Sequence, residues 1–236
     1  MQHTDVQEFR AGRSGETVSE VLRGDIEEFV NELRQTNRLL ASARLGTLSL
    51  DAIGRYLRSI HYLLRHTPVH LSLAEEEARH RGHLELADYF ARKSAEEVGH
   101  DQWAEADMAA LSKRFGVTLP ADPCATIVTT VKANANTILE NPLLYLVYIL
   151  FAEYSIVLIG PEWIGALEKH CGVPASMMTA VGNHAELDKE HVVEGSADID
   201  AFLDGRSLEP ARESLRGVML RFAAFCDELC DEHSSS

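Results

Sequence analysis

The stretch LYLVYILFAEYSIVLIG, Leu144–Gly160, decides the fold of this chain. It is apolar on every side and carries one carboxylate, Glu153, near its middle. A helix that is apolar all round belongs in the centre of a folded protein. No segment reaches ~18 uninterrupted apolar residues, which a membrane span requires. We therefore predict a buried central helix from Pro142 to about His170, bent near Gly160-Pro161.

The segments on both sides of this helix repeat their apolar residues at spacings of three and four, which predicts amphipathic helices. Ser49 is expected to cap one helix, Thr67-Pro68 to kink or interrupt it, and Gly116 to end another. No alternating strand pattern occurs. The fold class expected is all-α, a single domain over residues 1–236 with seven to eight helices in one bundle and flexible ends at 1–16 and 232–236. The expected outer helices cover about 17–43, 49–66, 70–82, 84–115, 125–139, 174–192 and 208–231.

Composition limits the function. The 236 residues carry 37 acidic and 22 basic side chains, a formal net charge of −15, which argues against nucleic acid or an anionic membrane as a partner. Four cysteines are too few for a disulfide scaffold, and the first residues, MQHTDVQEFRAGRSGE, have no apolar signal core. We expect a reduced, cytoplasmic protein.

Three parts of the sequence have histidine or carboxylate side chains, which can bind metals, at positions expected to face the core. Glu97 and His100 are three residues apart in the expected helix 84–115, so both should project from one face. His184, Asp188 and His191 stand at i, i+4 and i+7, a single helical stripe. The third place is Glu153, because an unpaired buried carboxylate is very costly and needs a proton, a partner or a metal.

The spacings differ in specificity. With 37 acidic residues and 11 histidines, an acid-x-x-His pair should arise by chance ~1.7 times, so Glu97 and His100 alone are weak evidence. The His-x3-acid-x2-His pattern should arise ~0.08 times, which makes the triad specific. Glu186, Lys189 and Glu190 lie off its stripe, toward solvent. Three carboxylates and three imidazoles suffice for two iron ions with positions left open.

At EEVGHDQWAEADM (Glu96–Met108), Glu153 and HAELDKEH (His184–His191), the sequence resembles the haem-oxygenase-like di-iron oxidases and oxygenases. RSIHYLLRHTPVHLSLA (Arg58–Ala74) is similar to the helix before their first ligand pair. The resemblance covers roughly residues 50 to 195. The chain departs from ferritin-like bundles, which use two Glu-x-x-His motifs, because its second motif is His-x3-Asp-x2-His.

The resemblance implies a ligand set and a chemistry. Glu97 and His100 would serve one metal, Glu153 would bridge, and the triad would complete the second. Two Fe ions, with Mn possible at one site and no haem, would use O2 and an external reductant on an amino-acid-like or carboxylate substrate. N-oxygenation, oxidative C–C cleavage and desaturation fit this ligand set equally. The resemblance also implies a homodimer with a role in specialised, natural-product metabolism. Some relatives place a further glutamate near residues 63 and 64, where this chain has leucines, so a contribution from His61 or His66 stays open.

Two other classes of function remain as alternatives. One is a non-enzymatic iron-binding protein for storage or sensing. The other is a haem oxygenase, a cofactor-free oxidase or a thiamin-degrading hydrolase of the same architecture; haem would leave the triad unexplained, and no cysteine adjoins a His/acid pair in sequence. Asp107 is expected to hold a ligand imidazole in place. Trp103 is expected to pack the bundle rather than contact substrate. Tyr145, Tyr148 and Tyr154 flank Glu153 and are expected either to donate hydrogen bonds at the site or to belong to the core. Arg55, Arg58 and Arg65 are expected either to hold a substrate carboxylate or to be exposed.

Overall fold

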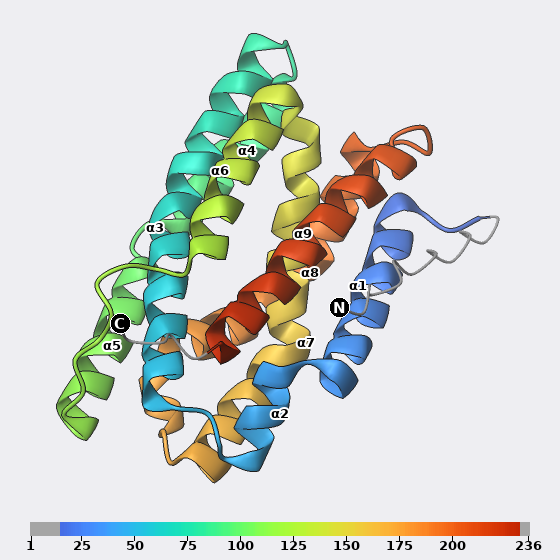
Figure 1. The fold of residues 1–236 in the computed structure, drawn as a ribbon. Helices are drawn as coiled ribbons and strands as arrows, with labels where there is room; N and C mark the ends of the chain where they lie inside the picture. The colour runs from blue at the N-terminus through green and yellow to red at the C-terminus, as the bar shows by residue number, and fades with distance from the viewer. Residues whose placement is uncertain (1–14, 232–236) are drawn as a thin grey trace.

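The computed structural model describes residues 15–231. The ends expected to be flexible, 1–16 and 232–236, lie outside this range except for residues 15 and 16. The described residues form an all-α bundle without strands, which confirms the predicted fold class. Figure 1 shows its helices in chain order. They are α1 (Val18–Thr36), α2 (Arg38–Leu45), α3 (Leu50–His80), α4 (Leu84–Glu97), α5 (Asp101–Phe115), α6 (Ala125–Glu140), η1 (Pro142–Leu144), α7 (Tyr145–Cys171), η2 (Ala175–Met177), α8 (Thr179–Phe202) and α9 (Leu208–Cys230).

Local sequence signals set several helix ends. The Thr17 side chain accepts a hydrogen bond from the Glu20 N–H, and the Glu20 carboxylate accepts one from the Thr17 N–H, a capping box that starts α1. Ser49 caps α3 through the Ala52 N–H, as predicted. Gly116 ends α5 at φ +65°, a left-handed conformation that favours glycine.

Two predicted helix boundaries are wrong. The segment expected as one helix over 17–43 is divided at Asn37, whose side chain accepts hydrogen bonds from the Leu39 and Leu40 N–H groups and starts a new helix. Conversely, Pro68 does not interrupt α3. A proline inside a helix costs ~3 kcal/mol. Packing of α3 against α4, α5 and α6 offsets this cost, and the Ser94 hydroxyl of α4 lies 3.4 Å from the Pro68 carbonyl oxygen.

Helix α7 is the centre of the bundle, as its apolar sequence predicts. Its first half packs into one core cluster through residues such as Tyr145 and Phe151, and its second half into another through Trp163 and Leu167. The segment Pro142–Cys171 is long and apolar enough to cross a membrane by length and composition, a test that buried core helices also pass. In this fold 56% of its most apolar window is buried inside the protein.

Helix α8 packs along α7, which brings its polar stripe against Glu153. Gly160 allows the close approach. A Cβ on Gly160 would stand 3.3 Å from side-chain atoms of Ala185 and Val181, whereas one on Gly195 would make an ordinary contact at 3.5 Å from Glu153 Oε2. A side chain at position 160 would therefore require these α8 neighbours to shift.

Candidate metal centre

The six predicted ligands meet in two groups, each with donor atoms within 4.8 Å of one another. The groups do not follow the sequence motifs, because each takes residues from different helices. In the first, His184 of α8 joins the Glu97–His100 pair. In the second, Glu153 of α7 joins the other two members of the α8 stripe. The two groups are Glu97, His100, His184 and Glu153, Asp188, His191.

Glu97 and His100 lie at a turn and not within one long helix, so the predicted helix over 84–115 is wrong. Helix α4 ends at Glu97, and Gly99 adopts φ +91°, which only glycine takes without strain. The chain then restarts as α5. The expected pairing nevertheless holds, because the turn brings His100 Nδ1 to 3.1 Å from Glu97 Oε2.

The α8 stripe has the predicted orientation. Asp188 is 3% exposed and His184 8% exposed, whereas Glu186, Lys189 and Glu190 are exposed to solvent. His184 Nδ1 lies 2.7 Å from the Ala180 carbonyl oxygen. A carbonyl only accepts, so Nδ1 carries the proton and the neutral ring keeps a lone pair on Nε2. That Nε2 is buried 3.8 Å from Glu97 Oε2, beyond hydrogen-bond distance, and has no hydrogen-bond partner, the orientation a metal-binding histidine needs.

Asp107 holds the beginning of α8 and not a ligand imidazole, which corrects the expectation. Its carboxylate accepts hydrogen bonds from the Thr179 hydroxyl at 2.7 Å and the Ala180 N–H at 2.8 Å. Since the Ala180 carbonyl accepts from His184, Asp107 supports that ring through the backbone. Trp103 stacks on His100, with ring centroids 4.2 Å apart.

Glu153 is buried as predicted, with 7% of the residue exposed, but it has a partner that sequence reasoning missed. Lys93 Nζ lies 3.1 Å from Glu153 Oε1. The other oxygen, Oε2, is buried without a hydrogen-bond partner. A signal for Lys93 does exist: it continues the buried face of α4 seven residues after Leu86 and three after Phe90, where an apolar residue is the norm.

The carboxylates of the centre titrate far from their usual range. Burial raises the pKa of Glu97, but the neighbouring His100 and His184 outweigh it and lower that pKa to about 2. Burial raises the pKa of Glu153 to about 7, against the opposing charge of Lys93. Burial and then the charge of Glu153 raise the pKa of Asp188 to about 7. Lys93 lowers both of these raised pKa values but does not outweigh burial, so a further positive charge would be needed to keep both carboxyls ionised at neutral pH.

The donor set fits metal ions. Carboxylate oxygens and imidazole nitrogens are accepted by iron, manganese and zinc. Two buried donor atoms, His184 Nε2 in the first group and Glu153 Oε2 in the second, lack a hydrogen-bond partner, and a cation bound in each group would satisfy them. The cation in the second group would also add positive charge beside Glu153 and Asp188. The donor types leave the identity of the metal open.

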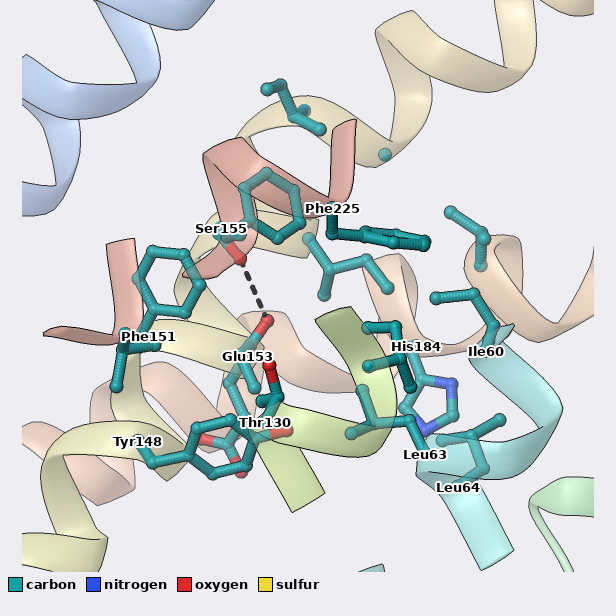
Figure 2. A pocket seen from close by; sticks show the side chains of 18 of the residues that line it. Ile60, Leu63, Leu64, Thr130, Tyr148, Phe151, Glu153, Ser155, His184 and Phe225 are labelled. Carbon is teal, nitrogen blue, oxygen red and sulfur yellow. Dashed lines mark hydrogen bonds between the residues drawn. The ribbon is translucent and has the colours of Figure 1, made fainter. Parts of the chain in front are cut away.

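A cavity of about 210 Å³ adjoins these residues. Figure 2 shows the side chains of Glu153 and His184 among the apolar groups that line it, including Leu63 and Leu64 of α3. Neither His61 nor His66 lines this cavity among the described residues, and His66 Nδ1 lies 2.7 Å from the Tyr62 carbonyl oxygen.

Of the three tyrosines expected near Glu153, two line the cavity. Tyr145 and Tyr148 do so, and the Tyr145 hydroxyl is buried without a partner. Tyr154 instead donates a hydrogen bond to Glu27. Cys226 also lines the cavity, but burial raises the pKa of its thiol to about 12, which disfavours a nucleophilic thiolate.

Comparison with known proteins identifies the fold class. No protein-family model and no curated protein matches the chain. Among solved structures, a domain of unknown function with a haem oxygenase-like fold from Shewanella denitrificans OS217 superposes with a TM-score of 0.77 and 14% identity, over 90% of this chain and 91% of that one. TenA homologues are similar too. The Pyrococcus furiosus homologue superposes with a TM-score of 0.68 and 14% identity, over 90% of this chain and 99% of that one. The P. horikoshii OT3 homologue superposes with a TM-score of 0.69 and 16% identity, over 91% of this chain and 98% of that one.

These likenesses define the chain as an all-α protein with a haem oxygenase-like fold, as predicted. At such identities they show the fold alone. Within it, the chain carries two buried His/carboxylate groups beside an apolar cavity.

Proposed function

We propose that this chain is an O2-dependent non-haem di-iron oxidoreductase acting on a small organic substrate. One observation carries the proposal: the two His/carboxylate groups, Glu97/His100/His184 and Glu153/Asp188/His191, converge beside an apolar cavity. Two ferrous ions held there would supply the electrons that activate O2. N-oxygenation, oxidative C–C cleavage and desaturation all fit this ligand set. A homodimer, an external reductant, a cytoplasmic setting and a role in specialised metabolism belong to the same proposal.

The side chains of the centre have separate tasks in this function. His184 presents a free Nε2 because Ala180 fixes its ring. Glu153 offers charge and a free Oε2 between the two groups. The apolar lining excludes water from the reacting atoms and strengthens every electrostatic contact there.

Metal analysis after substitution tests the ligand assignment. His184→Ala and His191→Ala should each lose at least one of about two bound iron ions per chain, because each removes a donor from a different group. His83→Ala is the matched control, an exposed histidine at the other end of α4, about 20 Å along the helix. Unchanged stoichiometry and iron affinity in both ligand variants would reject the site.

A storage or sensing protein is the rival function. Anaerobic Fe(II) loading followed by O2 separates the two, because an enzyme should show a transient visible absorption band that its substrate removes faster. Repeated turnover with about two irons per chain supports the oxidoreductase. Uptake of many more irons per chain, with no substrate effect, would support storage.

The cavity favours an apolar carboxylic acid as substrate. By comparison with the ~150 Å³ cavity that holds benzene, about 210 Å³ suits roughly eight to ten carbon atoms. None of the three α3 arginines that could have held a carboxylate lines the cavity. Arg55 donates to the Leu229 carbonyl, Arg58 donates to the Pro120 carbonyl, and Arg65 is exposed. Arg221 of α9 instead lines the cavity, and its Nε is buried without a hydrogen-bond partner.

Arg221→Met should therefore weaken octanoate binding at least about tenfold, the typical worth of a charged hydrogen bond. Affinity for 1-octanol, which fills the same space without the charge, should stay unchanged. Calorimetry on metal-free protein measures both. Equal losses for the two ligands would mean that Arg221 only shapes the cavity.

A further inference from the structure

Lys93 is a buried cation inside the candidate metal centre. Its side chain leaves α4 one turn before Glu97, and only 6% of the residue is exposed. Nζ lies 3.1 Å from Glu153 Oε1 and 3.4 Å from Glu96 Oε2. Glu153 belongs to the candidate ligands, whereas the Glu96 side chain is 47% exposed at the rim. Lys93 thus has one partner in the centre and one toward solvent.

The ion pair limits what Glu153 can offer to metals. A carboxylate that bridges two ions uses both of its oxygens. Here Oε1 contacts Lys93, and Oε2 alone is without a partner. A metal bound to Oε1 would stand ~2.0–2.2 Å from that oxygen, beside the ammonium group, and would be repelled by it. Glu153 is therefore ready to serve one ion, and serving a second requires Lys93 to leave.

The charges agree with this limit. Glu97, Glu153 and Asp188 contribute three negative charges when ionised, and Lys93 contributes one positive charge. One divalent cation makes the buried centre neutral, whereas two give it an excess of two positive charges, which is costly in a low-dielectric interior. Glu96 is about half exposed, so solvent screens its charge.

We propose that Lys93 is a resident cation that makes the two metal positions unequal. One ion binds tightly while Lys93 remains on Glu153. The second ion binds only when Lys93 swings to Glu96, which frees Oε1 and moves the ammonium charge to the rim. This inference rests on the proposed metal centre and deepens it by naming the residue that controls its loading.

Anaerobic titration of metal-free protein with Mn(II), following free Mn(II) by its EPR signal, tests the proposal without an activity assay. The wild type should bind one equivalent tightly and the second at least about tenfold more weakly. Lys93→Met keeps an unbranched side chain without charge and should bring the second affinity close to the first. Lys93→Arg keeps the charge and should preserve the difference.

Glu96→Gln should have the opposite effect and covers the case in which Lys93→Met does not fold. Without its rim partner, Lys93 stays on Glu153, so the second Mn(II) should bind more weakly still while the first is unchanged. Glu190→Gln removes an exposed charge beside His191 and is the matched control, expected to behave as wild type.

The outcomes separate this inference from the proposed function. Two equally tight ions in the wild type and in Lys93→Met would overturn the role of Lys93 and leave the two-metal centre intact. No binding by any variant would reject the metal centre itself, and the role of Lys93 with it. Equal weakening by Glu96→Gln and Glu190→Gln would mean that general charge, and not the lysine, sets the second affinity.

Discussion

Glu153→Gln is expected to retain the fold and to abolish oxygen-dependent turnover. Glutamine has nearly the same shape but lacks the charge that would hold a metal ion where α7 and α8 pack together. Loss of a residue that merely supports a ligand typically costs 10- to 100-fold in affinity or activity, so loss of this ligand should cost at least about a hundredfold. The effect is measured by comparing O2 consumption of the iron-loaded variant with that of the iron-loaded wild type, in the presence of a substrate that the wild type converts.

The free energy of unfolding of Glu153→Gln, measured against pH, provides a second test, and the direction of the expected change can be worked out. Burial raises the pKa of Glu153 from 4.5 to about 7, so the folded state binds this proton more tightly than the unfolded state. Metal-free wild type therefore loses stability as the pH rises from about 4.5 to about 7. Glu153→Gln cannot ionise, so without metal it should equal wild type near pH 4 and exceed it by roughly 3 kcal/mol at pH 8. The pKa of about 7 already includes the attraction between Glu153 and Lys93.

Iron should remove this advantage, because a bound cation compensates the Glu153 charge in the wild type alone. Melting curves at pH 8 with and without Fe(II) make the comparison. A higher melting temperature for Glu153→Gln with iron present would argue against a metal pair bridged by this residue.

Zn(II) in place of iron is expected to stop turnover completely. Zinc binds the same carboxylate and imidazole donors but has no redox chemistry, so it cannot pass electrons to O2. Loading should still raise the melting temperature, since the ligands are satisfied either way. Turnover should return when iron replaces zinc.

The contrary result is equally informative. Substrate conversion by zinc-loaded protein in the absence of O2 would identify the metal as a Lewis acid. The oxidoreductase proposal would then give way to a hydrolase or lyase in the same bundle.

Local sequence patterns were sufficient for the fold class and for the metal-type residues. Helical periodicity is a property of neighbouring residues, so the all-α bundle follows from it, and so does the stripe of His184, Asp188 and His191. The burial of Glu153 follows from its apolar neighbours on a helix that can only be central. These features needed no knowledge of how the helices pack.

Packing decided the rest, because it depends on residues far apart in the chain. The division of the donors into two groups cannot be predicted from any sequence pattern, because it requires α8 to lie between the Glu97 turn and α7. The groups are Glu97/His100/His184 and Glu153/Asp188/His191. The engagement of Asp107 with α8 and of Arg55 with α9 arises only when those helices meet.

Lys93 is the clearest case of this division. In the sequence, Lys93 is a basic residue at an apolar position of α4. It departs from the amphipathic pattern of the helix, but this alone does not identify a function. Its meaning depends on Glu153, 60 residues away, because two buried charges are tolerated only as a pair. Local sequence patterns are enough to identify the residues that can bind a metal, because they depend on neighbouring residues. The pairing of Glu153 with Lys93 follows only from the packing of α4 against α7 and α8.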